Sequence, residues 1–94
     1  MSKVIENQRG SVLLEALQVI NGERQDQYGN PENNFERIAG FWSAYTGTVL
    51  TGHDVAMMMA LMKIARICTG TGTQDSYIDC AGYIGLACDI DPRG

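Results

Sequence analysis

Two pairs of charged residues in the second half of the chain have the types and spacing needed for phosphate chemistry. Lys63 and Arg66 are three positions apart, and Asp75 and Asp79 are four positions apart, so each pair shares one face if its segment is helical. Mg²⁺ binds through one or two carboxylates together with waters and substrate phosphates. The aspartates are therefore candidate metal ligands, and the cations are candidate catalytic residues that neutralise phosphate charge developing in a transition state.

The same four charges also fit a purely structural role. A cation near a helix C-terminus and an anion near a helix N-terminus are each favoured by the helix dipole, by about 0.3–1 kcal/mol when exposed. If the two segments are antiparallel helices, the cations and carboxylates would meet and hold the helices together. The residue types leave the metal site and the structural ionic cluster as alternatives.

A second acidic pair lies earlier in the chain, at Glu32 and Glu36. If the fold turns this pair toward Asp75 and Asp79, four carboxylates converge, and such a cluster is tolerable only with a metal ion or bound protons. Glu36 is then a third candidate ligand for Mg²⁺. The alternative is that carboxylates in a first helical turn simply interact with the positive end of the helix dipole.

A polar stretch with several planar and amide side chains precedes these glutamates. Arg24, Tyr28 and Asn34 are candidate substrate-binding residues, because such groups suit a nucleotide base or ribose. The alternative is a turn alone, since Gly29 supplies an unusual backbone angle and an Asn-Pro step at Pro31 initiates a helix.

The hydrophobic periodicity predicts the elements that position these residues. Ser11 is a candidate N-cap, Pro31 suits a first helical position, and the glycines of a TGTGT run end the third periodic segment. Because short loops join the periodic segments, we expect an all-α, four-helix bundle-like single domain over residues 1–94. The predicted helices span residues 11–22, 31–46, 52–68 and 74–88.

The third and fourth predicted helices should lie side by side and antiparallel, since the loop between them is short. The third carries apolar residues in every direction around its axis, which is typical of a helix surrounded by protein, so we expect it at the centre. On the fourth helix, Gly82 and Gly85 would permit close helix approach. One side of this helix carries Tyr77, Ile78, Ala81, Ile84, Gly85 and Cys88, and the other carries Asp75, Asp79, Gly82 and Leu86.

Composition restricts the class of protein further. A net charge of −4 from seven cations and eleven anions provides no basic face for gripping nucleic acid. Ninety-four residues with 11 glycines support only a thin core, so self-association into a homo-oligomer would help stability. No signal core or stretch of about 20 apolar residues is evident. We therefore expect no membrane partner and a cytoplasmic location, in the host cell if the protein is phage-encoded.

The order of the motifs resembles a family of small phage and prophage proteins of uncharacterised function. The resemblance rests on R-x-x-x-YG from Arg24, on DVAMMMALMKIAR, which contains Lys63, and on DSYIDCAGY, which contains Asp79. Those proteins are in turn distantly similar to all-α nucleoside triphosphate pyrophosphohydrolases of the MazG type. In the latter, an ExxE pair on one helix and an ExxD pair on the next hold Mg²⁺ while water attacks the α-phosphorus. Asp75 and Asp79 would occupy the place of the second pair, with a spacing of four instead of three.

Two functional hypotheses follow. The resemblance implies a MazG-like protein that binds a nucleotide with Mg²⁺ and that, if it is an enzyme, hydrolyses nucleoside triphosphates. It also shows a departure, because Lys63 and Arg66 stand where the enzymes carry acidic residues. The alternative is a non-catalytic helical oligomer or interaction module in which the Lys/Arg–Asp cluster is structural.

Overall fold

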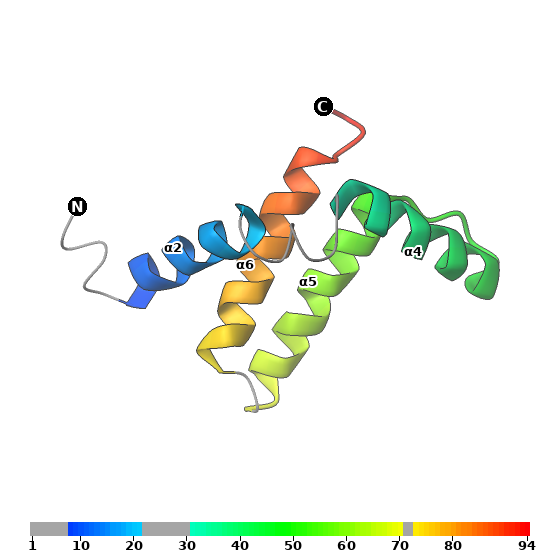
Figure 1. Cartoon of the computed structure of the whole chain (residues 1–94). Helices are drawn as coiled ribbons and strands as arrows, with labels where there is room; N and C mark the ends of the chain where they lie inside the picture. Colours follow the sequence, from blue (N-terminus) through cyan, green and yellow to red (C-terminus); the bar gives the residue numbers. More distant parts are fainter. Residues whose placement is uncertain (1–7, 22–30, 71–72) are drawn as a thin grey trace.

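The computed structural model describes residues 8–21, 31–70 and 73–94 of the chain (Figure 1). The described residues form helices and connecting turns and contain no strand, which confirms the all-α prediction. The helices are α2 (Gln8–Asn21), α4 (Pro31–Thr46), α5 (Gly52–Cys68) and α6 (Gln74–Asp89). No helix in these ranges is long and apolar enough to span a bilayer.

The helix boundaries agree closely with the periodicity. Gly47 (φ 71°) and Gly70 (φ 78°) adopt left-handed conformations directly after α4 and shortly after α5, as glycines that end helices commonly do. The exception is the start of α2, which begins at Gln8. The assignment of Ser11 as an N-cap is therefore wrong, because Gln and Arg are good helix formers that extend the helix upstream of its apolar stripe.

An antiparallel hairpin of α5 and α6 forms the centre of the molecule (Figure 1). The remaining two helices lie on opposite sides of this hairpin, with α2 across α6 and α4 against the N-terminal part of α5. The C-terminal half of α4 points away from the hairpin. The described part of the chain is thus an open arrangement of helices, and it lacks the closed cross-section of a four-helix bundle.

The core lies where α4, α5 and α6 meet. It is built from Phe35, Ala39, Val55, Ala56 and Ala87, and the rings of Phe35 and Tyr83 pack with their centroids 6.3 Å apart. Small side chains dominate these buried positions, so the helices approach closely but bury little apolar surface.

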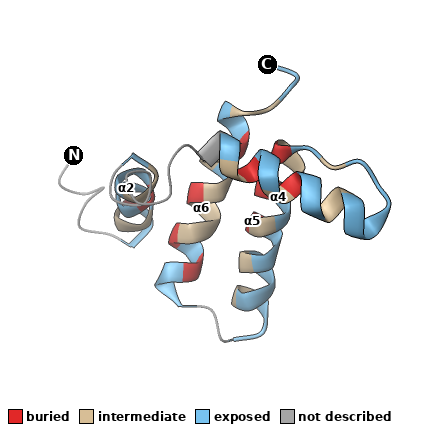
Figure 2. Ribbon diagram, turned by 45° about the vertical axis from the view of Figure 1, so that its right-hand side comes forward, coloured by how far each residue is buried: buried red, intermediate tan, exposed pale blue. Residues whose placement is uncertain are grey.

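The third predicted helix, α5, lies between α4 and α6, but the described residues do not surround it. Only α4 and α6 pack on α5 among the described helices, and its other side is open (Figure 2). Leu61 is 59% exposed and Met62 is 44% exposed. The apolar residues around α5 therefore correctly indicate a helix that is stabilised when every side is buried. The described residues of one protomer bury only one side.

Burial does not follow the two predicted sides of the fourth helix. On the first side Ile78 is 5% exposed, whereas Tyr77 and Ile84 are 52% and 44% exposed, and Cys88 is exposed as well. Ser76, Gly82 and Ala87 are also buried, because α6 lies between α5 and α2. The predicted close approach is confirmed: a Cβ added to Gly82 would lie 3.2 Å from Ile20 Cγ2 of α2.

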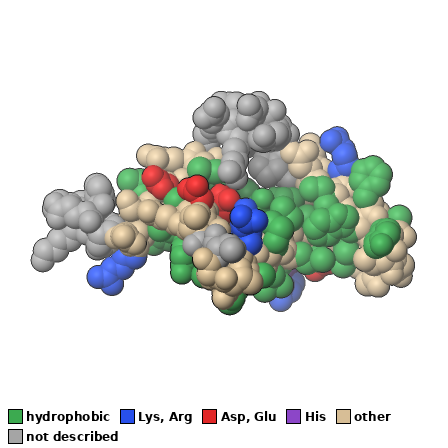
Figure 3. Space-filling model, turned by 90° about the horizontal axis from the view of Figure 1, so that it is seen from below, with side chains coloured by type: hydrophobic (Ala, Val, Ile, Leu, Met, Phe, Trp, Pro, Cys, Tyr) green, Lys and Arg blue, Asp and Glu red, His purple; other side chains and the backbone are tan. Residues whose placement is uncertain are grey.

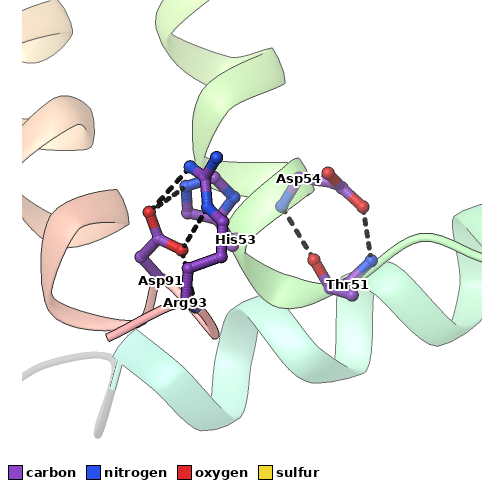
Figure 4. Close-up of polar contacts among 5 residues, drawn as sticks. All are labelled: Thr51, His53, Asp54, Asp91 and Arg93. Carbon is purple, nitrogen blue, oxygen red and sulfur yellow. Dashed lines mark hydrogen bonds and ion pairs between the residues drawn. The ribbon is translucent and has the colours of Figure 1, made fainter.

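The start of α5 is fixed by a capping box (Figure 4). The Asp54 N–H donates to Thr51 Oγ1 at 3.1 Å, and the Thr51 N–H donates to Asp54 Oδ2 at 2.9 Å. The backbone hydrogen bond from Thr51 holds the pKa of Asp54 below its usual range. Two of the N–H groups that every helix start leaves unpaired are satisfied in this way.

A second contact fixes α4 against the same helix start. The Gly52 N–H donates to Glu36 Oε1 at 3.0 Å. A Cβ at Gly52 would lie 2.5 Å from that same oxygen and 3.3 Å from Phe35 Cβ. Glycine at this position therefore permits both the Glu36 hydrogen bond and the close approach of α4.

Gly52→Ala tests this close approach. The added methyl group should displace Glu36 and press on Phe35, lowering the free energy of unfolding by about 1–2 kcal/mol. Gly40→Ala is the matched control, because Gly40 is exposed in α4 and an added Cβ would meet nothing within 4 Å. The control should gain about 0.5–1 kcal/mol from helix propensity. Urea unfolding measures both, and equal effects of the two variants would contradict the packing described.

Candidate functional site

The predicted meeting of cations and carboxylates is confirmed for one pair. Lys63 Nζ lies 3.1 Å from Asp79 Oδ2, and the two side chains are only 19% and 17% exposed. Lys63 lies on the side of α5 that faces α6, so its charge is directed into the helix hairpin. Figure 3 shows acidic and basic side chains next to each other on the face viewed from below.

The other two predicted members lie at the same end of the hairpin. Arg66 is in the last turn of α5 and Asp75 is in the first turn of α6, where each charge has the sign that its helix dipole favours. Both residues are exposed. The cluster thus combines one shielded ion pair with two charges in contact with solvent.

Glu36 does not join this cluster. Its carboxylate accepts a hydrogen bond from Gly52 at the start of α5. Lys63 follows Gly52 by eleven residues in α5, which is about 16 Å along the helix axis at 1.5 Å per residue. Among the described residues, no group of three or more His, Cys, Asp or Glu side chains could hold a metal ion. The convergence of Glu36 with Asp75 and Asp79 is therefore absent, because α4 packs at the opposite end of α5.

The remaining ligand assignments stay predictions. A Mg²⁺ ion at this end of the hairpin would be held by Asp79 and Asp75 with waters and phosphate oxygens, as sparse magnesium sites are. The Glu32 side chain lies outside the described part of the chain.

The predicted base-binding residues are mostly outside the described ranges. Arg24 and Tyr28 fall between α2 and α4, in a segment that the structure does not describe. Asn34 is half-buried near the start of α4. Their role in binding a substrate stays a prediction.

A further ionic cluster, at the other end of the hairpin, was missed by the sequence analysis (Figure 4). Asp91, just after α6, accepts hydrogen bonds from the Nε and Nη2 atoms of Arg93 at 3.0 and 2.9 Å. Asp91 Oδ2 also lies 3.7 Å from His53 Nε2 in the first turn of α5. The Arg93 hydrogen bonds hold the pKa of Asp91 well below its usual range and raise that of Arg93.

This second cluster links the end of α6 to the beginning of α5. The Asp-Pro-Arg order at residues 91–93 was a local signal for the Asp91–Arg93 pair. The proximity of Asp91 to His53 had no such signal, because it depends on how α5 and α6 pack as a hairpin. The Lys63–Asp79 ion pair therefore joins α5 to α6, and at the other end of the hairpin Asp91, just after α6, lies 3.7 Å from His53 of α5.

A double-mutant cycle measures the Lys63–Asp79 interaction. Asp79→Asn and Lys63→Met should each lower the free energy of unfolding, because each leaves a shielded charge without its partner. The double variant should lose less than the sum, with a coupling energy of about 1 kcal/mol. Asp89→Asn is the control on the same helix, because Asp89 is exposed at the α6 C-terminus, and it should be neutral or slightly stabilising. Simple additivity in urea unfolding would show that the pair contributes nothing.

Comparison with known proteins places the chain among phage proteins. It is 47% identical over 77 residues to the Gene 55 protein of Mycobacterium phage L5, covering 81% of this chain and 49% of that protein. It is 49% identical over 76 residues to the Gene 55 protein of Mycobacterium phage D29, covering 80% of this chain and 50% of that protein. The chain thus spans about half the length of these curated relatives. No solved structure matches it.

The resemblance to a small phage protein family is confirmed by these matches, whereas the similarity to MazG-type enzymes stays a prediction. Residues 11–91 match the family described as a domain of unknown function, DUF6378. This match extends from within α2 to just beyond α6, so it contains the α5–α6 hairpin and the Lys63–Asp79 pair. The chain therefore belongs to the DUF6378 family.

Proposed function

We propose that this chain acts as a helical interaction module that assembles into a homo-oligomer in the cytoplasm of the host cell. In this proposal the Lys63–Asp79 pair is a structural lock between α5 and α6. The protein then acts by binding through the exposed surface of the α5–α6 hairpin, and the ionic cluster fixes the arrangement of the two helices that form this surface.

The observation that carries the proposal is the distribution of large and small apolar side chains. Alanines such as Ala56 and Ala60 are at most 1% exposed, whereas Leu61, Phe41 and Tyr45 are 59%, 71% and 93% exposed. Large apolar residues gain the most from burial, about 1.5–3 kcal/mol each, and extended apolar patches on a soluble protein mark interaction sites. Such an arrangement favours a further protein layer on the outside of the helices.

The geometry of the ion pair supports the structural role of the charges. Lys63 and Asp79 neutralise each other at 3.1 Å while both are largely shielded from water. Two long-range partners held in this way fix the register of α5 against α6.

Sedimentation equilibrium over a wide range of protein concentrations tests the proposal. The expected mass is an integer multiple of the 10.3 kDa protomer, and dilution should lower both the mass and the melting temperature, because oligomers dissociate by mass action. A protein that stays monomeric at every concentration would contradict it.

A second candidate function is binding of a nucleotide with Mg²⁺. It is supported by the position of Lys63, Arg66, Asp75 and Asp79 at one end of the hairpin, where two of the four charges are exposed. Asp75 and Asp79 would hold Mg²⁺, and Lys63 and Arg66 would contact phosphate oxygens.

Hydrolysis at this site would follow the reaction that the MazG resemblance implies. Water would attack the α-phosphorus, the bond from that phosphorus to the α–β bridging oxygen would break, and a nucleoside monophosphate and pyrophosphate would form. Arg24, Tyr28 and Asn34 would contact the base or sugar.

Thermal unfolding with each of the four deoxynucleoside triphosphates, with and without Mg²⁺, separates the two candidates. A nucleotide-binding protein should gain several degrees only when both components are present. Asp79→Asn should abolish this gain, while the control Asp89→Asn should keep it. For the interaction module, no nucleotide should shift the melting temperature and Asp79→Asn should lower it under all conditions.

A further inference from the structure

The side of α5 that points away from α6 is apolar along three turns. At 100° per residue, six positions from Met57 to Cys68 lie within about 60° of Leu61 around the helix axis, counting Leu61 itself, and none of them is charged. Asp54, in the first turn of α5, is the nearest charge on this side. They are Met57, Met58, Leu61, Ile64, Ala65 and Cys68, and each is exposed. We call these six residues the outer face of α5.

No other described helix covers this outer face. The contacts of α4 with α5 are at the N-terminal end, through Glu36, Gly52 and the cluster of Phe35 and Val55. The outer face is therefore uncovered by the described part of the chain.

The apolar surface continues from α5 toward α4. Figure 3 shows hydrophobic side chains over much of the surface between the centre of the molecule and the end formed by α4. The exposed apolar residues of α4 and the loop that follows it are Phe41 (71%), Tyr45 (93%) and Val49 (88%).

The area of this surface is appropriate for a second copy of the chain. Large apolar side chains have roughly 200 Å² each when fully exposed. The large residues of the outer face and Met62 are 37–59% exposed, and the residues of α4 and its loop are 71–93% exposed, so the two sets together offer about 900 Å² per copy. Two copies thus offer up to about 1,800 Å², within the range of about 1,200–2,000 Å² that specific protein–protein interfaces bury.

We propose that two copies of the chain pack through the outer faces of their α5 helices, antiparallel and with Leu61 closest to the two-fold axis. This inference rests on the proposed assembly and adds its surface and orientation. A two-fold axis brings each central residue against its own copy. A surface without charge at its centre can therefore pack against a second copy without repulsion between like charges.

Charge also decides the orientation. Asp54 lies in the first turn of α5 and only about 20° around the axis from Leu61. A parallel pair would bring the two Asp54 carboxylates together, whereas an antiparallel pair separates them by about 20 Å along the axis.

Disulfide trapping tests the orientation. In a background of Cys68→Ala, Cys80→Ala and Cys88→Ala, Leu61→Cys should cross-link to its own copy on mild oxidation, because a disulfide requires Cα atoms about 4.4–6.8 Å apart. A protein that retains Cys68 alone should not cross-link, because the two Cys68 residues of an antiparallel pair are about 20 Å apart along the axis. Cross-linking of both would show a parallel pair and overturn the proposed orientation.

A charge substitution tests the surface independently. Leu61→Lys should place two cations against each other and convert the oligomer to monomers with unchanged helix content by circular dichroism. Leu17→Lys is the matched control, because Leu17 on α2 is 52% exposed and Leu61 is 59% exposed, and it should leave the assembly intact. If wild-type protein is oligomeric but Leu61→Lys is equally oligomeric and Leu61→Cys does not cross-link, this surface assignment fails while the proposed function stands. A monomeric wild-type protein would overturn both.

Discussion

The structure depends on one constraint, which is that the apolar stretch of α5 from Val55 to Met62 surrounds the helix axis but is covered on one side only. The covered side contains Val55, Ala56 and Ala60, small enough for α4 and α6 to approach closely. The uncovered side contains methionines, Leu61 and Ile64. Since burial of large apolar side chains is the main favourable contribution to folding, a helix with this distribution is stabilised further when a partner is added.

Ionic contacts complement this apolar packing by fixing the register of the α5–α6 hairpin. Close packing of small residues tolerates sliding, because one alanine fits where another did. Lys63 with Asp79, and His53 with Asp91, join the two helices at separate heights along their axes. A slide by one turn, about 5.4 Å, would separate both pairs. Apolar contacts thus hold α5 and α6 together, and contacts between charged side chains fix how far one helix is shifted along the other.

Much of the local structure could be predicted because its causes lie within a few residues of one another. Pro31, Gly47 and the Thr51–Asp54 capping box start or end helices through their own backbone preferences and short-range hydrogen bonds. The Lys63–Asp79 contact could also be predicted, since a short loop between two helices makes them antiparallel neighbours. Contacts between distant segments, such as Glu36 with Gly52, had no such local signal.

By itself, the amino-acid sequence determined the four helical segments, the antiparallel hairpin and the pairing of its charged end, because periodicity, capping and loop length act locally. Only the tertiary structure decided which sides of α5 and α6 are covered and that Glu36 lies far from Asp79. An apolar stripe specifies that a helix face gains from burial. It does not specify which helix buries it, and here α4 packs at one end of α5 while the outer face stays open.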